Sequence, residues 1–137
     1  MLNAVIHGKA GRVNTGAGEE SISWKQLYQK REDLLTASFC TRFSYLTPLN
    51  QHRILKFCFA GKGDFTEFES IDYWPKYDLP EQESRKFVEP DLLIRFKYFD
   101  LLVEVKPPQG GDQYIDQWQL EIEGYFAQEV DTKPLKF

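Results

Sequence analysis

Two short apolar runs in the second half of the chain restrict the fold more than any other feature. The first covers Asp91–Phe96 and the second covers Leu101–Lys106, and both are rich in Leu, Ile, Val and Phe. Runs of this kind predict β-strands, and the few residues between them, 97–100, predict a tight antiparallel connection. Pro107 and Pro108 end the second run. The sequence therefore predicts a β-hairpin inside a sheet.

Helical periodicity lies on both sides of this hairpin. From Ser23 to about Leu46, apolar residues recur at three- and four-residue steps, and Ser23 with Gln26 predicts a capping box at the helix start. Pro48 forbids easy continuation of this helix. A closing helix is predicted over 113–128, with Asp112 as its N-cap.

Further strands complete the predicted sheet. Strands are expected at Arg53–Phe59 and Phe65–Tyr73, joined through the hairpin-turn chemistry of Gly61–Asp64. Residues 74–88 predict a long excursion, and Lys133–Phe137 predicts the opening of a strand that the chain does not finish. The predicted fold class is α/β, with a mixed β-sheet flanked by helices.

Length and composition restrict the class of protein. A chain of 137 residues fits one domain, with residues 1–22 as a glycine-rich flexible arm and 23–137 as the folded domain. No apolar run is long enough to span a bilayer, so a cytoplasmic protein is expected. Cys40 and Cys58 are expected to be buried and reduced, without zinc spacing. The net charge of −4 weighs against nucleic-acid binding but leaves room for a local positive groove.

Glu104 and Lys106 project from one face of the second hairpin strand, because side chains alternate faces with a period of two. Taken alone, they suit an ordinary surface pair. The preceding strand favours a site, because the hairpin brings Asp91, 13 positions earlier (104 − 91 = 13), near Glu104. Two neighbouring carboxylates repel each other unless a divalent cation intervenes, and Mg²⁺ prefers oxygen ligands. A lysine there can hold an attacking water or stabilise transition-state charge.

The run Pro90-Asp91, followed after about a dozen residues by Glu104-Val105-Lys106, resembles the PD-(D/E)XK nuclease superfamily over roughly residues 23–128. The resemblance implies a restriction-endonuclease-like fold with its C-terminal strand truncated, and Mg²⁺- or Mn²⁺-dependent hydrolysis of DNA by a metal-activated water. It implies that Asp91 and Glu104 bind the metal and that Lys106 acts in water activation. Residues 31–36 and 45–46 are loosely similar to nucleases of transposition and mobile-element systems.

The resemblance also implies a metal-linked glutamate on the first helix. Glu32 fits, because its spacing from Tyr28, Leu35 and Phe39 puts it on the apolar side of one continuous helix. A glutamate at the edge of that stripe, bonded to an arginine, is the structural alternative.

The closing helix offers Gln117 as an accessory residue near the lysine, with a solvated helix surface as the alternative. Some branches of the superfamily place a Gln or Tyr there. The Gln-x-x-x-Tyr pattern of one branch is absent, because position 121, four before Tyr125, is Glu.

Two rival hypotheses stand beside the endonuclease. The chain could be a catalytically weak nuclease-fold module that acts in binding or assembly within a mobile-element, defence or repair complex, as a homodimer or with a partner protein. The acids could instead be purely structural, paired to Arg95 or Arg53. Six basic residues could line a DNA-binding groove or be dispersed: Lys62, Lys76, Arg85, Lys86, Arg95 and Lys97.

Overall fold

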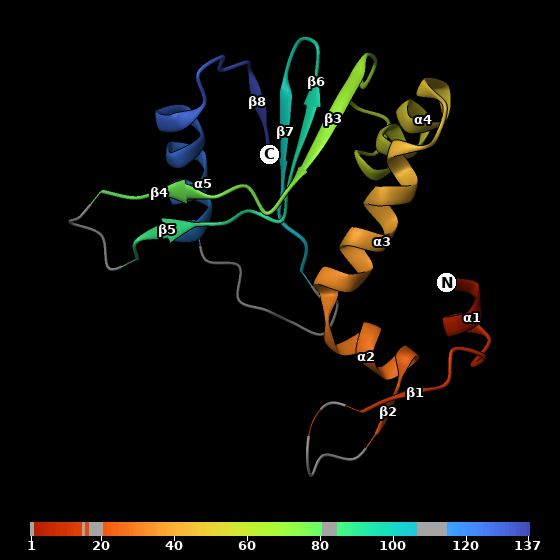
Figure 1. Ribbon diagram of the computed structural model, residues 1–137. Helices are drawn as coiled ribbons and strands as arrows, with labels where there is room; N and C mark the ends of the chain where they lie inside the picture. The colour runs from red at the N-terminus through yellow and green to blue at the C-terminus, as the bar shows by residue number, and fades with distance from the viewer. Residues whose placement is uncertain (1, 15, 17–20, 81–84, 107–114) are drawn as a thin grey trace. The chain divides into compact units, whose positions relative to one another are not determined.

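The computed structural model describes residues 2–14, 16, 21–80, 85–106 and 115–137, without the side chains of residues 2, 29, 30 and 32. The chain divides into two compact units, Met1–Phe39 and Cys40–Phe137 (Figure 1). This division differs from the expected boundary after residue 22. Residues of the expected arm form α1 (Leu2–Ile6) and β1 (Arg12–Val13), and β1 pairs antiparallel with β2 (Ile22–Ser23).

The first unit contains the predicted capping box. Ser23 caps α2 (Trp24–Lys30): its hydroxyl accepts from the Gln26 N–H, and the Gln26 side chain accepts from the Ser23 N–H at 2.9 Å. The expected single helix over 23–46 is wrong, however. The backbone leaves helical geometry at Arg31 (φ −128°, ψ 87°), and α3 (Glu32–Ser44) is a separate helix.

The predicted strand Arg53–Phe59 is also wrong, because these residues belong mostly to helix α4 (Pro48–Cys58). Thr47-Pro48 starts that helix: proline fits the first helical turn, where its missing N–H costs nothing. Gln51 and Leu55, four residues apart, are its buried positions. A proline that was expected to stop one helix therefore begins another.

The predicted turn at Gly61–Asp64 does not join two strands. The Gly61 N–H donates to Lys56 O at 2.6 Å and the Ala60 N–H donates to Phe57 O at 3.2 Å, which is a Schellman ending of α4. Ala60 has the positive φ that this helix ending requires, and Gly61 after it also has positive φ. The strand that follows, β3 (Phe68–Tyr73), begins three residues later than expected.

The mixed sheet is confirmed. Its strand order is β3, β6 (Leu92–Phe96), β7 (Asp100–Val103) and β8 (Leu135–Lys136) (Figure 1). The pairs β3–β6 and β6–β7 are antiparallel, as the predicted hairpin requires, and β7–β8 is parallel. Within the expected excursion, β4 (Tyr77–Asp78) and β5 (Phe87–Val88) form a second, two-stranded sheet.

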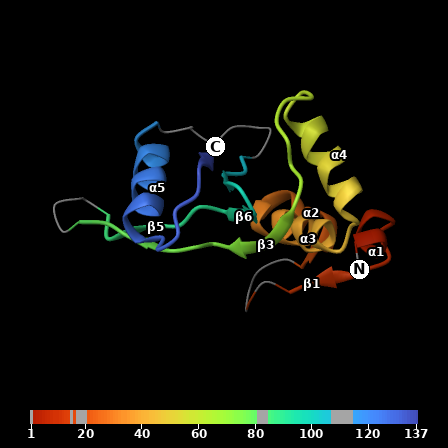
Figure 2. The same cartoon turned by 90° about the horizontal axis from the view of Figure 1, so that it is seen from above.

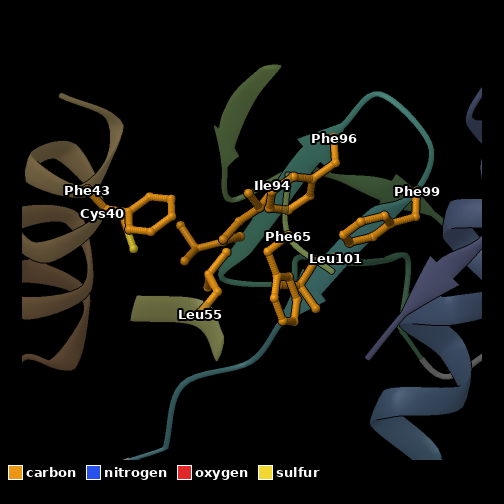
Figure 3. Packing of buried hydrophobic residues seen from close by; sticks show 9 residues of the cluster. Cys40, Phe43, Leu55, Phe65, Ile94, Phe96, Phe99 and Leu101 are labelled. Carbon is orange, nitrogen blue, oxygen red and sulfur yellow. The ribbon is translucent and has the colours of Figure 1, made fainter. Parts of the chain in front are cut away.

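Both faces of β6 are buried, which explains its nearly continuous apolar sequence. Leu92, Ile94 and Phe96 pack with residues of α4 and the last turns of α3 (Figure 3). Leu93, between them, packs on the other face with Tyr125 of α5 (Ile115–Gln128). Helices α4 and α5 therefore cover opposite faces of the sheet, as Figures 1 and 2 show.

Two smaller observations bear on the sequence predictions. Cys40 and Cys58 are both free thiols; Cys40 is buried as expected, whereas Cys58 is exposed at the end of α4. No helix in the described part of the chain combines the length and apolar character that a bilayer crossing needs.

Candidate functional site

The open end of the β6–β7 hairpin brings Asp91 and Glu104 together. In the hairpin register Leu92 pairs with Val103, so one further step sets Asp91 opposite Glu104. Asp91 Oδ2 accepts a hydrogen bond from the Val105 N–H at 2.6 Å, which ties the chain before β6 to the chain after β7. The predicted proximity of these two acids is therefore present, although β7 ends at Val103, three residues before its expected end.

Lys106 contacts the same carboxylate. Its Nζ donates to Glu104 Oε1 at 2.5 Å. This hydrogen bond raises the pKa of Lys106, burial opposes the rise, and the charges of Glu104, Asp91 and Glu121 add to it. Lys106 is thus a fixed ammonium ion among several acids.

Helix α5 contributes Gln117 and Glu121, one helical turn apart. The Gln117 Nε2 group donates to Glu104 Oε1 at 3.0 Å and to Glu121 Oε1 at 2.8 Å. Gln117 is partly buried and bridges two carboxylates, so its alternative as a solvated helix surface is wrong. We call Asp91, Glu104, Lys106, Gln117 and Glu121 the Lys106 cluster.

Glu121 was not among the predicted site residues. It is 0% exposed, and its Oε2 has no hydrogen-bond partner among the described residues. Its pKa is raised from 4.5 to about 7, chiefly by burial; the hydrogen bond from Gln117 and the charge of Lys106 lower it, and the charges of Glu104 and Asp91 add to the rise. The sequence carried a signal for this residue, because Gln117, Glu121 and Tyr125 recur at four-residue steps on one face of α5.

Glu32 is the first residue of α3 and belongs to the first unit. Its side chain lies outside the described residues, so its metal role stays a prediction. The reasoning that favoured it needs correction, because Tyr28 lies on α2 rather than α3. Leu35 and Phe39 are 51% and 52% exposed, so the expected buried stripe is not formed.

The donor set of the Lys106 cluster suits Mg²⁺ better than a softer metal. Within the described ranges, no three His, Cys, Asp or Glu residues are close enough to hold a metal by themselves. Mg²⁺ does not require this, because it commonly takes one or two carboxylates and completes its shell with waters and substrate phosphates. Asp91 and Glu104 supply two such carboxylates. Burial and the nearby Asp91 raise the pKa of Cys40 to about 11, so this thiol stays protonated and is a poor ligand.

Arg95 belongs to a second polar cluster at the other end of the hairpin. It donates to Asp72 at 2.7 Å, to Asp100 at 3.3 Å and to both oxygens of Glu129 at 3.1 Å. Tyr125 also donates to Asp100, at 2.8 Å. We call these five residues the Arg95 cluster. Arg95 is therefore engaged in the fold and is not a free cation of a DNA-binding groove.

Two cavities adjoin these clusters. One of about 500 Å³ is lined by Arg95 and Glu129 together with Lys76 and Lys133. The other, of about 200 Å³, is lined by Glu104 and Lys106 and by the aromatic rings of Phe59, Trp118 and Phe137. The second cavity shares its wall with the candidate catalytic groups.

The chain has a relative among known proteins. The chain is 33% identical over 138 residues to the uncharacterized protein PM0110 of Pasteurella multocida (strain Pm70). The alignment covers 98% of the chain and 51% of that protein, so the chain spans about half the length of the relative it matches. No family model and no solved structure matches the chain.

Proposed function

We propose that the protein is a Mg²⁺-dependent endonuclease that hydrolyses DNA phosphodiester bonds, with Asp91, Glu104 and Lys106 as its catalytic centre. The observation that carries this proposal is the meeting of two carboxylates and one ammonium at the open end of the β6–β7 hairpin. The sequence resemblance to the PD-(D/E)XK superfamily rests on the same three residues.

Each residue has a separate task. Asp91 and Glu104 hold the cation, and the Val105 N–H fixes the orientation of Asp91 by its hydrogen bond. Gln117 fixes Glu104 in the same way from α5. Mg²⁺ held by these two carboxylates would supply a lowered pKa for a coordinated water and positive charge against the phosphate. Lys106, released from Glu104, donates a hydrogen bond to the attacking water or to a phosphate oxygen.

Glu121 stabilises this arrangement from behind. It accepts the second hydrogen bond of the Gln117 amide at 2.8 Å, which leaves that amide little freedom to rotate away from Glu104. Because Glu121 reaches Glu104 through Gln117, it is a positioning residue in this proposal. Glu32 remains a proposed additional metal ligand.

DNA is the proposed substrate although the net charge is −4. A divalent cation at the site neutralises part of the local acidity, and exposed Lys62, Lys76, Arg85 and Lys86 are available for phosphate contacts. Action as a homodimer, or with a partner protein in the cytoplasm, belongs to the same proposal.

The decisive experiment is cleavage of supercoiled plasmid and of single-stranded DNA with and without Mn²⁺. Wild-type protein should cut only with the metal, and Lys106→Ala should cut about 10²–10³-fold more slowly, because it loses a donor to transition-state charge. Lys97→Ala removes an exposed lysine paired to Glu67 and is the matched control, with an unchanged rate. A Lys106→Ala protein that cuts at the wild-type rate would refute the assignment.

One observation favours the alternative of a catalytically weak binding module. Tyr45, Leu49 and Phe57 are large, strongly exposed side chains on and just before α4, and Phe57 is 86% exposed. Exposed apolar residues of this size suit contact with another protein. A protein of this kind would bind a partner through α4 and show no metal-dependent cleavage in the plasmid experiment.

A further inference from the structure

The cavity of about 200 Å³ beside Lys106 has an unusual wall for a site that handles phosphate. Phe59, Trp118 and Phe137 contribute aromatic rings to it, and Glu104 and Lys106 line it as well. Trp118 and Phe137 come from distant parts of the second unit and meet with ring centroids 5.3 Å apart. Phe137 is 46% exposed, so this aromatic surface is open to solvent.

The size of the cavity restricts its occupant. Pockets for drug-sized ligands usually measure roughly 300–1,000 Å³, so a cavity of about 200 Å³ suits one planar ring rather than a large cofactor. Aromatic side chains bind planar rings by stacking.

The cavity shares Glu104 and Lys106 with the proposed catalytic centre, and this indicates which planar ring it binds. A ligand that places a phosphate at Lys106 and a planar ring in the adjoining cavity is a nucleotide. In duplex DNA both faces of each base are covered by its stacked neighbours, so a paired base cannot enter. We propose that this cavity binds one unpaired base next to the cleaved phosphate, and that the substrate class is therefore single-stranded DNA or DNA with an unpaired nucleotide. This inference rests on the proposed nuclease function.

The test measures binding in EDTA, where metal-dependent cleavage does not occur. Fluorescence anisotropy compares three labelled DNAs of matched sequence: a single strand, a blunt duplex, and a duplex with one unpaired nucleotide. The single strand and the bulged duplex should bind about tenfold more tightly than the blunt duplex. Phe137→Ala should remove most of this preference, and Trp118→Leu should do so as well.

Phe126→Ala is the matched control, because Phe126 is an exposed aromatic residue of α5 that does not line the cavity. It should leave the preference unchanged. A 2-aminopurine base at the unpaired position should lose fluorescence on binding wild-type protein and keep it with Phe137→Ala. Phe137 is half-exposed and belongs to neither hydrophobic core cluster, so its substitution leaves the core intact if Trp118→Leu fails to fold.

Equal affinity for the three DNAs, or a preference that survives Phe137→Ala, would overturn the inference. So would a Phe137→Ala protein that unfolds more easily yet binds DNA normally, because the cavity would then be filled by the protein itself. These outcomes differ from failure of the proposed function. If the protein cuts paired DNA as fast as unpaired DNA, the proposed catalytic centre stands and only the proposed binding of a base in the cavity fails.

Discussion

The two ends of the β6–β7 hairpin carry polar clusters that differ in how their charges are satisfied. At the turn end, Arg95 donates directly to Asp72, Asp100 and Glu129. At the open end, Lys106 donates to Glu104, whereas the buried Glu121 receives a hydrogen bond only from a neutral amide within the described residues. Both clusters lie along α5. The fold therefore brings acidic residues together at two places, and it balances their negative charge with an arginine at one and with a lysine and a neutral amide at the other.

This difference separates a structural cluster from a candidate site. Burial lowers the pKa of Arg95, but its hydrogen bonds to Asp72 and Glu129 outweigh that effect and raise it, which is expected of an ion network that stabilises the fold. Each cluster has one buried carboxylate oxygen without a hydrogen bond to a described group, Asp100 Oδ1 and Glu121 Oε2, but Lys133 Nζ lies 3.9 Å from Asp100 Oδ1. In the Lys106 cluster the pKa of Glu121 is raised to about 7, and this carboxylate makes no ion pair with a described residue. Incomplete compensation of this kind is typical of functional sites.

The largest expected effect on stability is at the Arg95 cluster. Arg95→Met leaves the fully buried Asp100 without its arginine partner and frees Asp72 and Glu129, so the free energy of unfolding should fall by about 3–5 kcal/mol. Urea denaturation measures this loss. Lys97→Met, which breaks a half-exposed pair with Glu67, should leave the free energy of unfolding nearly unchanged. Equal stability of Arg95→Met and wild type would show that the Arg95 cluster does not stabilise the fold, and the proposed difference between the two clusters would fail.

A smaller effect, with a defined pH dependence, is expected at Glu121. Its pKa rises from an ordinary 4.5 to about 7 in the folded protein, so between these values the folded state holds a proton that the unfolded chain has released. Its contribution to stability is therefore fully present below about pH 4.5 and is lost as the pH rises through 7. Relative to Glu121→Gln, wild-type protein should lose up to about 3 kcal/mol between pH 5 and pH 8.

Urea denaturation of both proteins across this pH range makes the comparison. Glu123→Gln is the matched control, because Glu123 is an exposed residue of the same helix, and it should follow the wild-type pH dependence. If Glu121→Gln shows the same pH dependence as wild type, Glu121 is not the group that titrates.

The parts of the fold that the sequence predicted are those with strong local signals. The β6–β7 hairpin, helix α5, the Ser23 capping box and the strand near the end of the chain all have such signals. Helix α4 was missed because Ile54, Leu55 and Phe57 form an apolar run that suits either a strand or a buried helix. The break at Arg31 has no glycine or proline to mark it.

The candidate site was predictable where it depends on strand register and less so where it depends on packing. Strand pairing brings Asp91 to Glu104, and the short interval between their strands indicated this. The placement of α5 is set by long-range packing. The helix lies so close to Tyr77 of β4 that a Cβ added at Gly124 would be 2.7 Å from that residue, so only glycine fits there. The burial of Glu121 follows from that packing, so residue types alone did not reveal it.

The central claim is that the open end of the hairpin holds a divalent cation, and calorimetric titration with Mn²⁺ tests it most directly. Wild-type protein should bind Mn²⁺, and Asp91→Asn should bind it at least about tenfold more weakly, because the amide keeps an acceptor for the Val105 N–H but loses the charge. Asp72→Asn makes the same change in the Arg95 cluster and should bind like wild type. Equal Mn²⁺ affinity of wild type and Asp91→Asn would contradict the account.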